Sequence, residues 1–360
     1  MPPYLVYFYH RYLDFRLPEL DAVLKIYGID DTSSVYKAPE VVEGETPPPF
    51  LQLSLPSDDI AAKVAARCVL IKGIYTFLAV SQSYDELKDK LKAEYCNTSL
   101  HPADATWSFW VDCFGQKLSL AEQDQRRQRI TSTIDFPGVV QLKNADCAYW
   151  LFEEKGIETD ERDKVKRLYF ARQLHRTLPT RTARQYVDKH KLKKRKFIGP
   201  TSMDHELSLL MANLALVAPN SFVCDPFVGT ASVLIACAQF GAICLGGDID
   251  AQALHGTSGS ANINSNFDQY SLPLPELVNW DISHAAIRAP STSWFDAILC
   301  DPPYGLRESA HVSGQSNAIA PHRILASLLE YAATSLVIGG RLVYVMACQK
   351  RPSNDYAQHK

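Results

Sequence analysis

The second half of the chain alternates short apolar segments with helical ones, and this alternation restricts the fold more than any other feature. A helical face comes first, with apolar residues at 3.6-residue spacing between Leu207 and Val217. Five apolar strand candidates follow: Ser221–Cys224, Ile243–Gly247, Leu277–Asn279, Ala297–Cys300 and Arg341–Met346. Strands that alternate with helices form parallel sheets with helices on both faces, so we predict a doubly wound α/β fold for residues 201–346.

The first 155 residues lack this regular alternation. Their strand candidates are Tyr4–Tyr12, Phe50–Leu55, Val69–Val80, Thr106–Phe114, Val139–Leu142 and Ala148–Phe152. Helices are expected from Leu17 to Gly28, after a cap at Asp58, and from Leu120 to Ile130. We therefore expect residues 1–155 to form an α+β region with small sheets.

A strongly basic stretch separates the two regions. Residues 161–196 hold fourteen lysines and arginines against three acids, although the whole chain has a net charge of -3. Clustered cations of this kind are typical of phosphate binding. We expect residues 156–200 to be a basic linker or docking stretch whose contacts come from Lys191, Lys193, Lys194, Arg195 and Lys196. The alternative is a solvated linker that binds nothing.

The nine cysteines are scattered and never form a Cys-x-x-Cys pair. This argues against a zinc site and a disulfide framework, so we expect reduced cysteines, no bound metal and a cytoplasmic location. No apolar run approaches the roughly 18 residues that a membrane-spanning helix needs. The apolar N-terminus has neither a basic start nor a small-residue cleavage site, so we interpret it as a first strand.

The most specific motif is Cys300-Asp301-Pro302-Pro303-Tyr304-Gly305, which directly follows an apolar strand. It therefore stands at a strand's carboxyl end, where α/β folds bind ligands. Asp301 and the carbonyl of Pro302 offer two acceptors, which successive prolines hold stiffly. Two such acceptors can orient an exocyclic amine, and Tyr304 offers a flat face for a base. The plain alternative is a proline-rich turn.

A second motif joins a strand to a helix over residues 223–232. It has a single glycine, Gly229, so it is not the Gly-x-Gly-x-x-Gly motif that binds dinucleotides. A cofactor without phosphates needs only one close backbone approach, and Asp225 could accept a hydrogen bond from its amino group. A purely structural turn is the alternative.

Two further acids end the next strands. Asp248 follows Asp225 at close to the spacing of about 20 residues at which dinucleotide folds place a ribose-binding acid. Asp250 is then expected to cap the following helix. Asp281 is either an acceptor for an adenine amino group or a turn residue.

The order of these motifs resembles the amino-methyltransferase branch of the class I methyltransferases: Asp-Pro-Phe-x-Gly-Thr, then Asp-Ile-Asp, then Asp-Pro-Pro-Tyr-Gly. The run from Leu192 to Asp204, Leu-Lys-Lys-Arg-Lys-Phe-Ile-Gly-Pro-Thr-Ser-Met-Asp, is similar to the catalytic subunit of the eukaryotic tRNA (guanine(10)-N2)-methyltransferase family. The N-terminal half resembles that family's ferredoxin-like and THUMP modules. The likeness covers about residues 1–346.

The resemblance implies a Rossmann-like methyltransferase sheet, S-adenosylmethionine as cofactor, and guanine N2 in tRNA as methyl acceptor. It also implies a small zinc-binding activator subunit as partner in a heterodimer. The cofactor-binding residues would be Thr201, Ser202, Met203, Asp225, Phe227, Gly229, Asp248 and Asp281. The catalytic residues would be Asp301, Pro302, Pro303 and Tyr304.

One departure from the family concerns the end of the sheet. Class I methyltransferases add a sixth and a seventh strand, whereas residues 347–360 form a short polar tail. We therefore expect an incomplete sheet of about five strands, a chain shortened at its C-terminus and an open edge at Arg341–Met346. Two alternatives stay open: a non-catalytic tRNA-binding isoform, and an amino-methyltransferase that acts on adenine N6 or glutamine.

Overall fold

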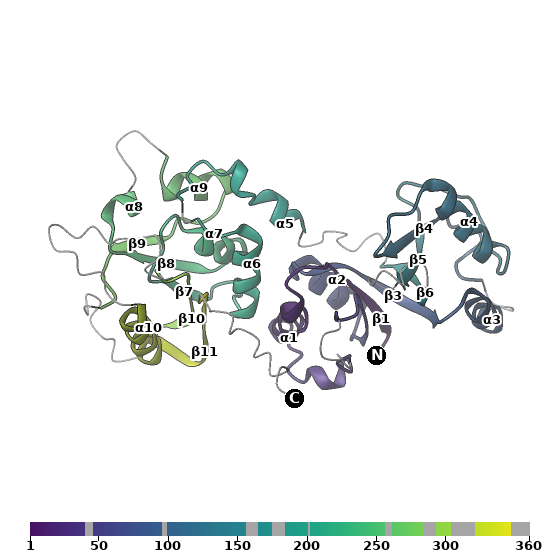
Figure 1. The fold of residues 1–360 in the computed structure, drawn as a ribbon, viewed down its shortest axis with the longest axis horizontal. Helices are drawn as coiled ribbons and strands as arrows, with labels where there is room; N and C mark the ends of the chain where they lie inside the picture. Colours follow the sequence, from purple (N-terminus) through teal and green to yellow (C-terminus); the bar gives the residue numbers. More distant parts are fainter. Residues whose placement is uncertain are drawn as a thin grey trace, which may run out of the picture. The chain divides into compact units, whose positions relative to one another are not determined.

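The computed structural model describes residues 1–39, 46–95, 99–155, 165–174, 184–200, 202–255, 261–283, 293–303 and 321–346. The chain divides into two compact units, unit 1 (Met1–Asp188) and unit 2 (Lys189–Lys360). Figure 1 shows an α+β arrangement in unit 1 and a layered α/β arrangement in unit 2.

Unit 1 is built on one six-stranded sheet with the order β2-β1-β3-β6-β5-β4. Its strands are β1 (Pro3–Phe8), β2 (Phe50–Ser54), β3 (Ile71–Ser81), β4 (Trp107–Phe114), β5 (Cys147–Lys155) and β6 (Val165–Gln173). The long strand β3 pairs with β1 near its start and with β6 towards its end. The α+β class is confirmed, but this strand joins two smaller modules into one sheet where several small sheets were expected.

Helices bury one face of that sheet. They are α1 (Arg16–Ile26), α2 (Asp58–Arg67), α3 (Tyr84–Tyr95) and α4 (Leu120–Thr131), with short 3-10 turns η1 (Leu13–Phe15) and η2 (Thr32–Ser34). Two apolar cores form beneath them, one under α1 and α2 and one under α3 and α4. The cap of α2 is Ser57, one residue before the expected Asp58, because its side chain accepts a hydrogen bond from the Ile60 N–H.

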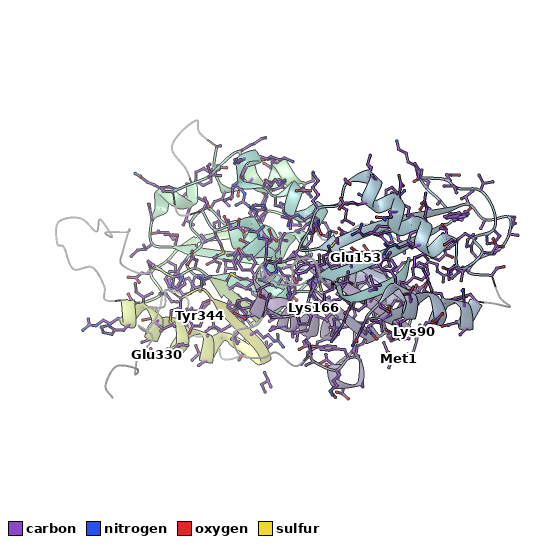
Figure 2. All side chains as sticks on the ribbon, turned by 45° about the vertical axis from the view of Figure 1, so that its right-hand side comes forward. Met1, Lys90, Glu153, Lys166, Glu330 and Tyr344 are labelled. Atoms are coloured by element: carbon purple, nitrogen blue, oxygen red, sulfur yellow. The ribbon has the colours of Figure 1, made fainter. Side chains whose placement is uncertain are left out.

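The opposite face of the sheet holds an aromatic core. Phe50 lies on the edge strand β2, yet its ring centroid is 4.7 Å from that of Tyr169 on β6 and 5.4 Å from that of Phe152 on β5. Strands that are not neighbours can touch in this way only if the sheet curls strongly. Glu153 of β5 (Figure 2) points to the other, helix-covered face, where its carboxylate accepts hydrogen bonds from Arg126 of α4 and Tyr84 of α3.

Unit 2 confirms the predicted doubly wound fold. Its strands β7 (Phe222–Asp225), β8 (Ile243–Asp248), β9 (Glu276–Asn279), β10 (Phe295–Cys300) and β11 (Leu336–Tyr344) are all parallel, in the order β11-β10-β7-β8-β9. Its helices are α6 (His205–Leu214), α7 (Ser232–Gln239), α8 (Ala251–His255), α9 (Ile263–Tyr270) and α10 (Pro321–Ser335). The strand order reverses between β7 and β10, and such a switch point is where this fold binds ligands.

Two predicted strands have different bounds in the structure. The fifth strand of unit 2 begins at Leu336, earlier than the expected Arg341, because Leu336 pairs with the buried Phe295 of β10. The segment expected at Val139–Leu142 contributes a single bridge, from Val140 to Trp107. Strand β11 lies at the edge of the described sheet, where Figure 2 labels Tyr344.

The interpretation of residues 156–200 as a linker differs from the structure. Strand β6 lies inside this range and pairs with both β3 and β5, because Leu168 and Phe170 are buried in the core of unit 1. A short helix, α5 (Arg184–Lys189), and a 3-10 turn, η3 (Leu192–Lys194), follow. The basic residues of β6 therefore belong to a folded sheet.

The segment from Lys189 to Gly199, here called the strap, is held by unit 2. The buried side chain of Asn266 on α9 donates to the Phe197 carbonyl and accepts from the Phe197 N–H, both at 2.8 Å. The half-buried side chain of Gln269 donates to the Lys194 carbonyl at 2.7 Å and accepts from the Lys196 N–H at 3.0 Å, and both of these bonds are exposed. The strap is thus a fixed part of unit 2.

The structure describes seven of the cysteines. None of these seven forms a disulfide, and all but Cys147 are buried. In the described part of the chain, no helix has the length and apolar character needed to cross a bilayer.

Replacing Asn266 by alanine should release the strap. Both hydrogen bonds to Phe197 are lost, so amide exchange in a peptide that covers residues 193–199 should speed up roughly tenfold or more. Hydrogen–deuterium exchange with mass spectrometry measures this. Gln269→Ala is the matched control and should have a smaller effect, because the two hydrogen bonds of that side chain are exposed to solvent. Unchanged exchange in Asn266→Ala would contradict this anchoring.

Candidate functional site

Four acids gather at one edge of the sheet of unit 2. Asp225, Asp248 and Asp301 stand at the carboxyl ends of β7, β8 and β10, and Asp281 follows β9. Because the strand order is β10-β7-β8-β9, these acids lie across the sheet in the order Asp301, Asp225, Asp248, Asp281. The sequence predicted the position of each acid relative to its own strand, and the topology places them in a row.

Asp225 is at the centre of this row and is buried. Burial, together with the nearby carboxylates of Asp248 and Asp301, raises the pKa of its carboxyl to about 8, against a hydrogen bond from the Phe227 N–H at 3.0 Å. The two neighbouring carboxylates make the surroundings of Asp225 negative, and such surroundings suit a cationic group.

Asp248 ties the ends of β7 and β8 together. Its Oδ2 accepts from the Gly229 N–H and its Oδ1 accepts from the Asp250 N–H, both at 2.9 Å. Burial raises the pKa of this carboxyl. Asp250 in turn accepts from the Gln252 N–H at 2.8 Å, so it caps the start of α8 as predicted.

The turn after β7 leaves room for a ligand beside the backbone. Gly229 has φ of 47°, and a Cβ placed there would meet only the Phe227 carbonyl oxygen, at 4.0 Å. Gly247 is the opposite case, because a Cβ there would lie 2.6 Å from the ring of Trp280. Gly247 of β8 therefore allows Trp280 to pack closely, whereas Gly229 faces open space that a cofactor without phosphates can fill.

The remaining candidate cofactor-binding residues differ in their surroundings. Asp281 accepts from the Ser283 N–H at 2.9 Å and from the Ser283 hydroxyl at 2.6 Å, so it does form a turn. Ser202 accepts from the Gly199 N–H at 2.8 Å and lies 2.7 Å from the Thr230 hydroxyl, which brings it beside the turn after β7. Met203 is buried, and Thr201 lies outside the described residues.

The catalytic candidates follow β10 next to the sheet's edge strand. Asp301 is half-buried, Pro302 is buried and Pro303 is half-buried. The Cys300 carbonyl accepts from the Val345 N–H at 3.2 Å, so the turn starts while still bonded to the end of β11. Tyr304 lies outside the described residues.

The five predicted phosphate contacts separate into two kinds. Lys191, Lys193, Lys194 and Lys196 are exposed on the strap. Arg195 is only 6% exposed and donates to the Ser232 hydroxyl at 2.7 Å, so it is not available to a phosphate at the surface. The expectation for Arg195 is corrected because its side chain points into unit 2.

Sequence reasoning also missed the residues around that arginine. His190 lies in the strap and forms a hydrogen bond with Gln239. Beneath the strap, Ser232 accepts from Arg195, and Thr230 shares a hydrogen bond with Ser202. Thr230 and Ser232 adjoin the glycine turn, which is the one signal that could have drawn attention to them. Nothing in the run of basic residues distinguishes the buried cation from the exposed ones.

Substituting Asp225 by asparagine should change how stability depends on pH. The folded carboxyl keeps its proton up to about pH 8, whereas the unfolded one releases it near pH 4. The wild type should therefore lose stability relative to Asp225→Asn as pH rises from about 4 to about 8, by a few kcal/mol at most, and no further above that. Thermal unfolding of both chains over this range measures it. A difference that stays constant with pH would contradict the burial of an ionisable group here.

Two family models match the chain, one in each unit. Residues 2–178 match the family model for the Tmrp11 THUMP N-terminal domain, and residues 193–358 match that for the RMKL-like methyltransferase domain. Among solved structures, TrmN from Thermus thermophilus is 16% identical, with a TM-score of 0.46, over 95% of this chain and 88% of that one.

Two curated relatives are similar along nearly the whole chain. The human protein tRNA (guanine(10)-N(2))-methyltransferase TRMT11 is 34% identical over 95% of this chain and 78% of its own length. The Saccharomyces cerevisiae tRNA (guanine(10)-N(2))-methyltransferase is 30% identical over 96% of this chain and 84% of its own length. On this evidence the chain belongs to the tRNA (guanine(10)-N(2))-methyltransferase family.

Proposed function

We propose that this protein transfers a methyl group from S-adenosylmethionine to the exocyclic N2 of a guanine in tRNA, at position 10 as in its named relatives. The row of acids Asp301, Asp225, Asp248 and Asp281 carries this proposal. Its order along the sheet matches the order of groups that must be held: an amine to be methylated, an amino acid, a ribose and an adenine.

The cofactor would lie along β7, β8 and β9. Asp281 accepts from the adenine amino group and Asp248 from the ribose hydroxyls, since a carboxylate whose oxygens each take one backbone N–H can accept further bonds. The methionine end lies near Asp225, Phe227 and Gly229, bordered by Thr201, Ser202 and Met203. S-adenosylmethionine supplies an electrophilic methyl group on a sulfonium.

The substrate amine would be held beside the cofactor by the turn after β10. Asp301 and the Pro302 carbonyl each accept one N–H of the guanine amino group, and two successive prolines keep these acceptors in place. Tyr304 stacks on the base, which must first leave its own stack. Most of the rate acceleration then comes from positioning.

The rest of the chain would bring the tRNA to this edge. Unit 1 and the four exposed lysines of the strap supply shape recognition and phosphate contacts. A small zinc-binding subunit is the partner that the family resemblance implies. We place the protein in the cytoplasm, where its free cysteines stay reduced.

Two alanine variants test which acid of the row holds the substrate amine and which holds the cofactor. Asp301→Ala should abolish methyl transfer while cofactor affinity stays within about threefold, because this acid holds the amine. Asp248→Ala should weaken cofactor binding by about 1.5–3 kcal/mol, through loss of a charged acceptor. Isothermal titration gives the affinities, and mass spectrometry of digested tRNA gives the N2-methylguanosine. Near-normal turnover in Asp301→Ala would overturn the assignment.

Removing the four exposed charges of the strap tests its contact with tRNA. Replacing Lys191, Lys193, Lys194 and Lys196 by glutamine should weaken binding and flatten its dependence on salt. Four lost phosphate contacts reduce the log–log slope by up to about 3–4 units. Binding measured across a salt series decides this, and equal slopes for both chains would mean that these lysines only face solvent.

A further inference from the structure

Arg195 is a buried cation without a buried counter-ion. Among the described residues of unit 2 it is the only buried lysine or arginine, and no described carboxylate forms an ion pair with it. Its Nη1 donates to the Ser232 hydroxyl at 2.7 Å and its Nη2 donates to the His190 carbonyl at 3.4 Å, while its Nε makes no hydrogen bond. Burying a charge in this way is costly unless something else pairs with it.

The surroundings of Arg195 compensate its charge only in part. Burial lowers the pKa of the neighbouring His190 to about 4, and the cations Lys189 and Arg195 act in the same direction, so this imidazole is neutral at neutral pH. Of the groups that face Arg195, Tyr270 and Asp204 favour its charged form, but burial outweighs them and lowers its pKa. Arg195 is therefore a buried cation whose charge its neighbours do not fully offset.

A row of hydroxyls leads from this charge to the candidate cofactor turn. Ser232 accepts from Arg195, and its hydroxyl lies 3.5 Å from that of Thr230. The Thr230 hydroxyl lies 2.7 Å from that of Ser202, which already accepts from the Gly199 N–H. With protons directed away from the arginine along this row, Ser202 keeps its own O–H free to donate to a ligand.

The N-terminus of α7 adds partial positive charge near Arg195 and the hydroxyl row. Ser232 is the first residue of this helix, and the preceding Ala231 supplies no side-chain cap. The first N–H groups of α7 therefore carry the partial positive charge of a helix N-terminus. The helix, the arginine and the hydroxyl row all favour an anionic group on the side of the turn where Ser202 and Thr230 meet.

We propose that Arg195 is a positioning residue for the α-carboxylate of the cofactor's methionine, and acts through Ser232, Thr230 and Ser202. This inference rests on the proposed function. An α-amino acid carries one positive and one negative group. The acids Asp225, Asp248 and Asp301 together form a negative region for its ammonium, and the buried arginine behind the hydroxyl row attracts its carboxylate. No direct contact between Arg195 and the ligand is required.

Two nucleoside ligands separate this role from a merely structural one. S-adenosylhomocysteine contains the amino acid, whereas 5′-methylthioadenosine has the same adenine, ribose and sulfur without it. Isothermal titration of each ligand into the full chain should show that Arg195→Met weakens S-adenosylhomocysteine by about 10- to 100-fold and leaves 5′-methylthioadenosine within about twofold. Arg195→Lys, which keeps the charge, should recover part of the loss. Arg323→Met, which removes an exposed arginine of α10, should change neither.

A second variant covers the case in which Arg195→Met does not fold. Ser202→Ala removes only the last donor of the row, and it should also weaken S-adenosylhomocysteine selectively. Equal weakening of both ligands by these variants, or of neither, would overturn the role of Arg195 while leaving the cofactor site intact. A wild-type chain that binds neither ligand would overturn the proposed function itself.

Discussion

The hydrogen bond from the Gly229 N–H to Asp248 joins the turn after β7 to the end of β8, and the rest of the candidate cofactor site depends on it. It fixes the turn after β7 against the end of β8, so that the space beside Gly229 stays open and the acid stays at its rim. The parallel pairing of β10 with β7 then brings Asp301 near Asp225. The fold thus holds these acids close together despite their mutual repulsion, which is typical of functional sites.

Unit 1 has no regular parallel sheet of the kind seen in unit 2, so its sheet is held together in a different way. Its long strand β3 carries one sheet through two modules, and the aromatic core on the concave face locks the curl of that sheet. The strap continues from α5 into unit 2, where Asn266 and Arg195 fasten it. The exposed lysines therefore stand on a fixed segment next to the cofactor turn, and Arg195 couples that segment to α7.

The sequence was sufficient for the features that depend on local pattern. Apolar runs followed by an acid located Asp225, Asp248 and Asp301 at strand ends, and the α/β class followed from the alternation of elements. Features that depend on partners far along the chain were not accessible in this way. The place of β6 between β3 and β5 rests on pairing with residues that precede it by up to about a hundred positions. Likewise, Arg195 is buried where it bonds Ser232, and nothing in the sequence distinguishes it from the neighbouring lysines, which are exposed.

A crystal structure of the chain with S-adenosylhomocysteine would test the order of the row most directly. The adenine should lie beside Asp281, and the ribose hydroxyls should lie within about 3.2 Å of Asp248. The sulfur should face the gap between Asp225 and Asp301, with the carboxylate towards Ser202. A ligand bound in the reverse direction, or away from the carboxyl ends of β7 and β8, would contradict the proposed site.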